Sequence, residues 1–261
     1  MGRALIAGLL RGGWRPEQLS AGESAAAARA AVLREFGVTA SDDNGTALAG
    51  ASIVVLAVKP QDAAAVLQPL ASALAVTRPL LISVAAGVRI AALESWCGPG
   101  VPVMRAMPNR PAWVGAGATG VYAPPTVSRQ QRAAAERVLQ AVGEVFWVEA
   151  EELLDVVTAL SGSGPAYFFL LAELMAEAGT QLGLESGVAH RLAAATLYGS
   201  GLLARSGDGD LARLRQEVTS SGGTTEAALR TLEAADLRAT VRAALAAATQ
   251  RGRELAAVRA G

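Results

Sequence analysis

The first 149 residues alternate short apolar runs with longer helical segments, and this alternation constrains the fold more than any other feature of the chain. The runs are QLSAG (18–22), SIVVLAVKP (52–60), LLISVAAG (80–87) and VPVMRAMPN (101–109). Apolar runs rich in Val and Ile, separated by helices, are typical of strands buried in a parallel sheet. Ligands of open α/β sheets bind beyond the carboxyl ends of the strands. We therefore predict an α/β domain with a site at residues 58–60, 85–87 and 107–109.

The chain opens with MGRALIAGLL, which reads as a helix with no strand before it. Its apolar run of about eight residues is too short for a secretory signal. In a dinucleotide-binding fold, a strand and G-x-G-x-x-G precede such a helix, and the helix N-terminus points at the pyrophosphate. Gly2 stands at the place of the last glycine. We expect about ten further residues upstream, forming a strand that ends in a Gly-x-Gly turn; without them, cofactor binding is expected to be poor.

After Glu149 the strand signals stop and Ala- and Leu-rich helical patterns follow. They predict helices at about 151–161, 165–183, 186–205, 224–235 and 237–256. We therefore divide the chain into an α/β domain, residues 1–149, and an all-helical domain, residues 150–261. In PAYFFLLAELMAEAG (165–179) nearly every side of the helix is apolar. Such helices are normally buried, so we expect this domain to form a subunit interface.

The composition argues against several classes of function. Lys plus Arg and Asp plus Glu are equal at 23 each, so no overall charge attracts nucleic acid or an anionic membrane. Cys97 is the only cysteine and His190 the only histidine. An intramolecular disulfide and a cysteine metal cluster are thereby excluded, and metal catalysis is not expected. The sequence shows no apolar stretch of the roughly 20 residues that a membrane span needs. We expect a cytoplasmic protein, with no metal and no membrane partner.

Two stretches of the helical domain differ from ordinary helix sequence. ALSGSGPAYFF (159–169) breaks one helix and starts another, which leaves Ser161 and Ser163 hydroxyls and free backbone donors at the break. In VTSSGGTTEAALRTLEAA (218–235) a Ser/Thr-rich loop with two glycines runs into a helix start. Such a start suits an anion, especially a carboxylate. Plain helix capping is the alternative interpretation of each stretch.

These stretches resemble one known family. LSGSGPAY and VTSSGGTT, with VVLAVKPQ, SVAAGV and MRAMPNRP upstream, look like pyrroline-5-carboxylate reductase, over essentially the whole chain and in order. The resemblance implies a Rossmann-type domain that binds NADPH or NADH, here with its first strand missing, and an all-helical dimerisation domain. It also implies reduction of 1-pyrroline-5-carboxylate to L-proline, the last step of proline synthesis, by a homodimer that assembles further into a decamer.

The resemblance also carries the family's site residues onto this sequence. For catalysis it implies Thr225, Ser161 and Thr158, with Thr225 as the hydrogen-bond donor to the imine nitrogen. For substrate binding it implies Ser220, Gly223, Thr224, Thr225 and Glu151. For cofactor binding it implies Gly2, Asn44, Ala57, Val58, Lys59, Pro60, Ala85, Ala86 and Gly87. Hydride chemistry belongs to the cofactor, so the protein mainly has to hold the two rings face to face.

Some positions depart from the family pattern or leave alternatives open. The loop reads SSGG where SPGG is common, so Ser221 leaves it less rigid, and Arg110 stands where a small polar residue is usual. Glu23 suits the 2′-hydroxyl of NADH, whereas Arg29 and Arg34 suit the 2′-phosphate of NADPH. A dehydrogenase for β-hydroxyacids or other imines usually has a lysine in the first helix of its second domain, and residues 165–183 have none. The other alternative is a binding or regulatory protein that has lost its cofactor.

Overall fold

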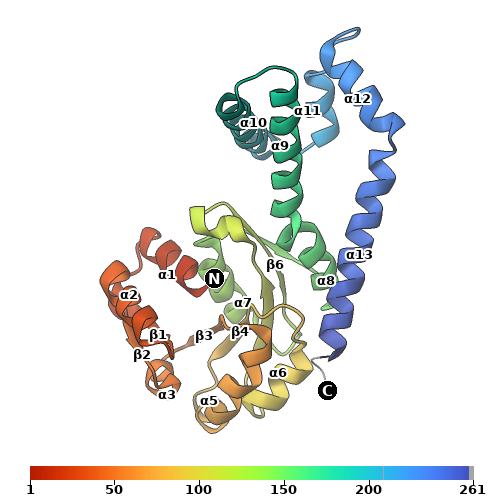
Figure 1. Ribbon diagram of the computed structural model, residues 1–261. Helices are drawn as coiled ribbons and strands as arrows, with labels where there is room; N and C mark the ends of the chain where they lie inside the picture. Colours follow the sequence, from red (N-terminus) through yellow and green to blue (C-terminus); the bar gives the residue numbers. More distant parts are fainter. Residues whose placement is uncertain (208, 259–261) are drawn as a thin grey trace. The chain divides into compact units, whose positions relative to one another are not determined.

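The computed structural model describes residues 1–207 and 209–258 (Figure 1). They form two compact units, which we describe separately: Met1–Ser163 together with the end of the chain from Ala248, and Gly164–Ala247. Residues between the expected domain boundary at 149/150 and Ser163 belong to the first unit. This division into compact units differs from the predicted domain boundary at 149/150, which stays a prediction from sequence.

The first unit contains all the strands of the described residues and eight complete α-helices, together with the end of a ninth, α13 (Leu237–Val258). The strands are β1 (Ser20–Gly22), β2 (Thr39–Ser41), β3 (Ile53–Leu56), β4 (Leu80–Ser83), β5 (Val103–Met107), β6 (Gly117–Tyr122) and β7 (Gly143–Trp147). The helices are α1 (Gly2–Arg11), α2 (Ala26–Phe36), α3 (Asn44–Leu48), α4 (Ala63–Leu67), α5 (Ala71–Thr77), α6 (Ile90–Cys97), α7 (Arg129–Gln140) and α8 (Leu153–Val157). Short 3-10 turns are η1 (Pro16–Gln18), η2 (Pro60–Asp62), η3 (Gln68–Leu70) and η4 (Arg110–Val114).

The main sheet has the order β3-β4-β5-β6-β7, and all neighbours are parallel except β5 and β6. The four predicted runs form β1, β3, β4 and β5, as the alternation indicates. The predicted strands β3, β4 and β5 pair in parallel, as expected, and the antiparallel step involves β6, which the sequence did not predict. Only η4 lies between β5 and β6, and a parallel return needs a longer crossover. The next connection contains α7, so β7 returns parallel to β6.

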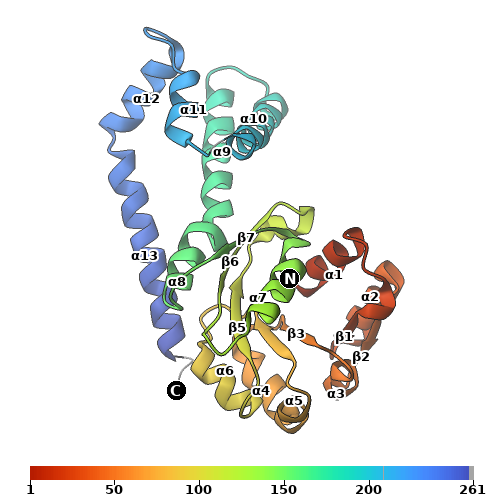
Figure 2. The ribbon, with the colours of Figure 1, turned by 180° about the vertical axis from the view of Figure 1, so that it is seen from behind.

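The two shortest strands form a sheet of their own. β1 and β2 pair in parallel, and no strand of the described residues joins them to β3. In both views they lie beside α2 and α3, apart from the main sheet (Figures 1 and 2). The first element along the chain is α1, which starts directly after Met1. The upstream strand expected from the sequence therefore stays a prediction.

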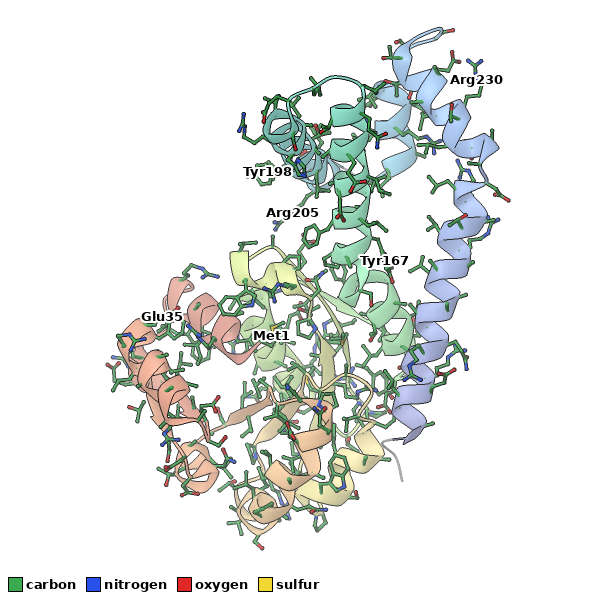
Figure 3. All side chains as sticks on the ribbon, in the orientation of Figure 1. Met1, Glu35, Tyr167, Tyr198, Arg205 and Arg230 are labelled. Atoms are coloured by element: carbon green, nitrogen blue, oxygen red, sulfur yellow. The ribbon has the colours of Figure 1, made fainter. Side chains whose placement is uncertain are left out.

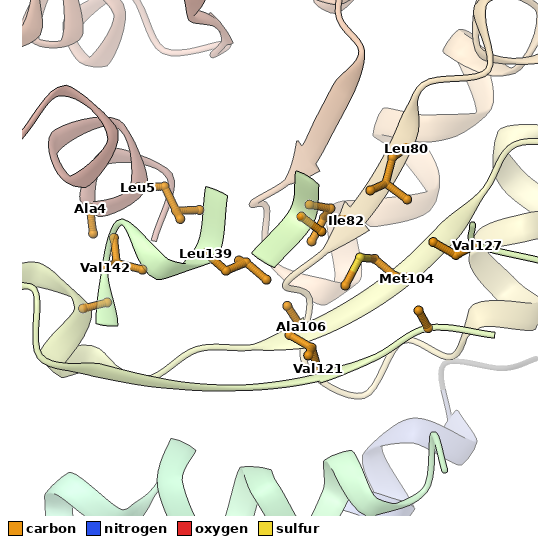
Figure 4. Close-up of a cluster of buried hydrophobic side chains, with 13 residues drawn as sticks. Ala4, Leu5, Leu80, Ile82, Met104, Ala106, Val121, Val127, Leu139 and Val142 are labelled. Carbon is orange, nitrogen blue, oxygen red and sulfur yellow. The ribbon is translucent and has the colours of Figure 1, made fainter. Parts of the chain in front are cut away.

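Two apolar layers cover the main sheet. On one face, Leu5 of α1 and Leu139 of α7 pack with Ile82 and Met104 (Figure 4). On the other face, Leu81 and Val103 face helices α4 to α6, where Leu67, Leu74, Leu93 and Cys97 are buried. Neighbouring residues of β4 thus point to opposite faces, as the pleat requires. Each fully buried side chain of this size stabilises the fold by about 1.5–3 kcal/mol, so the strand ends that carry the site are firmly held.

The second unit is helical. It contains α9 (Gly164–Gln181), α10 (Ser186–Ser206), α11 (Leu211–Glu217), α12 (Thr224–Ala234) and the first half of α13 (Leu237–Val258). α9 and α10 pack through small residues, Ala176, Ala189 and Ala193. Their large apolar side chains stay exposed, among them Phe168, Phe169, Leu174, Met175, Tyr198 and Leu202. Tyr198, labelled on α10 in Figure 3, is 70% exposed. Apolar surface of this extent is typical of an interface between subunits.

The sequence contains one apolar stretch of membrane-spanning length that the sequence analysis missed. Among the described residues, the helical run Leu153–Gln181 is long and apolar enough to cross a membrane by length and composition, with a mean hydropathy of 1.3. Its first turns carry Asp155, which is buried and ion-paired with Arg89 of the same unit. This end of the run therefore packs as part of a folded protein.

Candidate active site

The predicted cofactor residues of the main sheet gather at one edge. β3 and β4 are parallel, and Leu56 pairs with Ser83 at their carboxyl ends. Residues 57–60 and 85–87 follow these ends directly. Gly87 has a φ of +74°, a conformation that favours glycine, and it turns the chain toward α6. A Cβ added at Gly2 would lie 3.5 Å from the Cβ of Ala57, so the start of α1 reaches the same edge.

The start of α1 suits the diphosphate of a dinucleotide. Leu5 N is the first amide to bond back along the helix, to Met1 O at 3.1 Å. No side chain caps the preceding amides, and the first turn carries no acid. Burial, with a further contribution from the positive charge of Arg110, lowers the pKa of the Met1 amino group. Uncapped helix amides beside a cation are what an anionic group requires, so these residues fit the cofactor.

Asn44 lies at the end of the small sheet, next to β1. It begins α3, whose N-cap is Asp43. A Cβ added at Gly22 would overlap the amide oxygen of Asn44, so the side chain rests against this glycine. Asn44 and Gly22 therefore mark the carboxyl end of β1, where a Rossmann-type fold binds the adenosine half of its cofactor.

The LSGSG stretch forms a π-helical turn, Thr158–Gly162, between α8 and α9. π turns within helices are frequent at functional sites. The two hydroxyls of this turn that the resemblance implies in catalysis are engaged: Thr158 Oγ1 donates to Leu154 O at 2.7 Å, and Ser161 Oγ donates to Val157 O at 3.0 Å. The hydroxyl proton of Ser161 is therefore in use, and its oxygen keeps lone pairs that can accept a hydrogen bond. The catalytic role of Ser161 stays a prediction.

The MPN motif holds this turn in place. Asn109 Nδ2 donates to Ser161 O at 3.1 Å, and Asn109 Oδ1 accepts from Ala118 N at 2.9 Å. A Cβ added at Gly162 would lie 2.9 Å from Met107 Cε, so this glycine allows close packing. The end of β5 and the LSGSG turn are therefore joined by hydrogen bonds and close packing, a contact that the sequence did not predict.

Glu151 lies in a buried charge network. Its Oε1 accepts from Arg105 NH1 and from Ile90 N, each at 2.8 Å. Burial lowers the pKa of Arg105, and the hydrogen bond and charge of Glu151 oppose that shift. Arg89 donates to Glu151 O and pairs with Asp155. The sequence predicted Glu151 as a substrate contact and missed its partners, although Arg105 stands out as a charge within an apolar strand.

The VTSSGGTT loop forms an uncapped helix start within the second unit. α12 begins at Thr224, its N-cap is Gly223, and no side chain caps it. Gly223 N donates to Ser220 O at 3.0 Å, so this amide, predicted to bind substrate, is already used. Gly222 N donates to Glu226 Oε2 at 2.8 Å. The first helical bond runs from Ala227 N to Gly223 O, which leaves the amides of Thr224 and Thr225 for a ligand.

His190 and Cys97, the only histidine and cysteine of the chain, show no arrangement typical of a second active site. Nδ1 of His190 donates to Ser186 O at 2.8 Å within α10. Cys97 is fully buried, in line with its interpretation as a small apolar residue. In the part of the chain that the structure describes, no group of three or more His, Cys, Asp or Glu side chains is arranged to hold a metal ion.

A sheet with cofactor-binding features at one edge, joined to a helical unit, is the architecture of NAD(P)-dependent oxidoreductases. A family model for NADP oxidoreductases, described as coenzyme F420-dependent, matches residues 1–87. A second model, pyrroline-5-carboxylate reductase dimerisation, matches residues 151–255. The first defines the enzyme class of this chain, and the second indicates that it forms a homo-oligomer through its helical part.

Whole-length relatives give the family. The pyrroline-5-carboxylate reductase of Pseudomonas aeruginosa is 45% identical over 98% of this chain and 93% of its own length. That of Mycobacterium tuberculosis is 41% identical, with coverage of 98% and 93%. The structure of the Coxiella burnetii reductase has a TM-score of 0.94 and 40% identity, covering 97% of this chain and 94% of that one. The chain belongs to the pyrroline-5-carboxylate reductase family.

More distant structures share the cofactor class or the fold alone. The Plasmodium falciparum pyrroline carboxylate reductase with NADP bound has a TM-score of 0.83 and 28% identity, covering 98% of this chain and 94% of that one. A Streptomyces aurantiacus imine reductase has a TM-score of 0.54 and 20% identity, covering 98% and 92%. The alternative of another imine enzyme therefore rests on the shared fold, whereas sequence and structure together support the reductase family.

Proposed function

We propose that this chain reduces 1-pyrroline-5-carboxylate to L-proline with NADPH or NADH. The observation that carries the proposal is the uncapped start of α12 at VTSSGGTT, in a chain that matches these reductases from end to end. The free amides of Thr224 and Thr225, with the hydroxyls of Ser220 and Thr225 nearby in sequence, suit a small carboxylate at this helix start. That the substrate is a ring with a C=N bond is inferred from the family, because the loop alone indicates only a carboxylate.

The substrate carboxylate binds the amides of Thr224 and Thr225 and the hydroxyl of Ser220. A Cβ added at Gly223 would lie 2.5 Å from Ser220 Oγ, so this hydroxyl lies directly over the loop. Gly223 shapes the loop and leaves its own amide to Ser220 O. A carboxylate at this helix start also gains from the helix dipole.

Reduction adds a hydride to the imine carbon and a proton to the imine nitrogen. The cofactor, bound by Gly2, Asn44, residues 57–60 and residues 85–87, supplies the hydride. Thr225 is half-buried and donates its hydroxyl proton in a hydrogen bond to the imine nitrogen. Because a threonine hydroxyl is a weak acid, its part is to orient the nitrogen while water delivers the proton.

Thr158 and Ser161 serve as acceptors on the cofactor side of the reaction. Their protons are directed at backbone carbonyls, so each oxygen can accept a hydrogen bond from the nicotinamide. Glu151 acts as a positioning residue, because its carboxylate holds Arg105 of β5 and the first amide of α6. Glu151 thereby fixes β5 and the start of α6, and α6 is the helix that follows residues 85–87.

The enzyme works as a homodimer in the cytoplasm and assembles further into a decamer. The exposed apolar faces of α9 and α10 support the dimer, and the decamer follows from the family resemblance. Equal numbers of basic and acidic residues, 23 each, give no general attraction to nucleic acid or anionic membranes.

Steady-state kinetics with 1-pyrroline-5-carboxylate and each reduced cofactor tests the function, with proline identified as the product by mass spectrometry. We expect turnover with at least one cofactor, and none when the substrate is a β-hydroxyacid and the cofactor is oxidised. A folded chain that binds reduced cofactor but forms no proline would contradict the proposal and support the binding-protein alternative.

A further inference from the structure

Glu23 occupies the position from which an acid contacts the adenosine ribose. It follows β1 directly, and its amide donates to Ser41 O at 2.9 Å, which extends the pairing of the two strands. Its Oε1 accepts from Ala25 N at 2.9 Å, so the side chain is fixed before the first turn of α2. Its other oxygen makes no hydrogen bond within the described residues. In Rossmann-type folds an acid here accepts a hydrogen bond from the ribose 2′-hydroxyl.

Arg29, the basic residue near Glu23, already has hydrogen-bond and ion-pair partners. Arg29 NH1 donates to Glu23 O at 2.9 Å and to Ser24 O at 2.7 Å, and Arg29 NH2 pairs with Asp42 at 3.1 Å. These bonds make Arg29 a clamp for the loop after β1 and neutralise its charge with Asp42. A phosphate at this place would have to compete with all three acceptors.

The other basic residues of this region lie elsewhere. Arg34 is in the last turn of α2, about 12 Å along the helix from its first residue at 1.5 Å per residue. Arg3 pairs with Glu35 at the same end of α2. Lys59, the only lysine of the chain, follows β3 in the main sheet. None of the three belongs to the loop that follows β1.

Acidic groups therefore dominate the end of the small sheet. Asp43 follows β2 beside Asp42, and hydrogen bonds from the Thr46 side chain and from the amides of Gly45 and Thr46 hold its pKa below the usual value. Asp43 is thus ionised at neutral pH. Together with Glu23 and Asp42 it gives three carboxylates against the single guanidinium of Arg29. This surplus of negative charge disfavours a further dianion.

We infer that Glu23 makes this chain select NADH over NADPH: its free oxygen accepts from the ribose 2′-hydroxyl, and the surrounding carboxylates repel a 2′-phosphate. The inference rests on the proposed function, since it deepens the assignment of the cofactor site. It resolves the conflict between Glu23 and the two arginines that the sequence leaves open.

Fluorescence titration of the full chain with NADH and with NADPH, without substrate, tests the inference. We expect NADH to bind at least about tenfold more tightly, a difference of about 1.4 kcal/mol. Glu23→Gln should bring the two dissociation constants closer together, by weakening NADH and strengthening NADPH binding. Glutamine keeps the oxygen that accepts from Ala25 N, so α2 should form normally. Glu94→Gln, the same substitution on an exposed position of α6, is the matched control. It should leave the ratio of the NADPH and NADH dissociation constants unchanged.

Equal or tighter binding of NADPH by the unmodified chain would overturn the inference. So would a ratio of dissociation constants in Glu23→Gln that equals the ratio in Glu94→Gln, or no binding of either nucleotide. Thermal unfolding followed by circular dichroism confirms that the variants are folded. Turnover of 1-pyrroline-5-carboxylate is measured separately: a chain that binds NADH selectively but forms no proline contradicts the proposed function and leaves the selectivity standing.

Discussion

Thr225 and Ser220 share one loop, yet we expect their hydroxyls to serve different stages of the reaction. Thr225→Ala should lower kcat, because the lost hydrogen bond orients the imine nitrogen in the transition state. Ser220→Ala should mainly raise KM, because its hydroxyl holds the substrate carboxylate. A hydrogen bond to a charged group is worth about 1.5–3 kcal/mol, so each loss should be about 10- to 150-fold.

Steady-state kinetics and NADH titration measure these effects. Thr225→Ser should keep most of the activity, and all variants should bind NADH normally. Thr231→Ala is the control, since Thr231 Oγ1 donates to Ala227 O further along the same helix. An unchanged kcat/KM in folded Thr225→Ala would show that this helix start does not hold the substrate.

The reactivity of Cys97 is a second prediction about a single residue. Burial raises the pKa of its thiol to about 11, and the thiolate is the reactive form. At pH 8 only about one molecule in a thousand carries the thiolate, so the native protein should react very slowly with a disulfide reagent. Protein unfolded in guanidinium should react rapidly and once per chain. Rapid labelling of the native protein would show that α6 opens readily.

At the level of elements, the ion pair of Arg105 and Glu151 joins β5 to the segment before α8. Arg105→Met would leave the carboxylate of Glu151 without its guanidinium in a largely buried place. We expect a loss of about 3–5 kcal/mol in the free energy of unfolding, and a partial recovery when Glu151→Leu is added. Urea denaturation measures both.

The exposed pair of Arg251 and Glu254, 2.9 Å apart, is the control. Arg251→Met should cost less than about 1 kcal/mol. Equal losses in Arg105→Met and Arg251→Met would mean that the buried pair does not hold β5.

The elements also show what a sequence can predict. β3, β4 and β5 were predicted because their runs are apolar throughout, and the cofactor-binding edge followed from where those runs end. β6, with the sequence GATGVY, escaped notice because its glycines hide the strand pattern. The partners of Glu151 were missed because Arg105 lies 46 positions away in the sequence. The hydrogen bonds of the Thr158 and Ser161 hydroxyls were not foreseen, because in a helix a Ser or Thr hydroxyl can donate to the carbonyl four residues back.

For the whole molecule, the apolar faces of α9 and α10 predict a stable dimer or larger assembly. Phe169 is 59% exposed on α9, and Phe169→Asp would place a charge in the interface, which is costly when it is buried unpaired. Light scattering after size-exclusion chromatography should show an oligomer for the unmodified chain and a smaller species for the variant.

Val76 of α5 is 83% exposed, outside this face, and Val76→Asp is the control that should leave the mass unchanged. A monomer at micromolar concentration for the unmodified chain would contradict the prediction.

The path of the chain between its two units has a consequence for proteolysis and for engineering. The first unit contains residues on both sides of the second, because α13 starts in the second unit and ends in the first. The helical unit is therefore an insertion, tethered at two points. A single cut within it should leave both fragments bound through the first unit, and native gels should show one species until denaturant is added. Release of the inserted unit requires two cuts, one near Ser163 and one near Ala248.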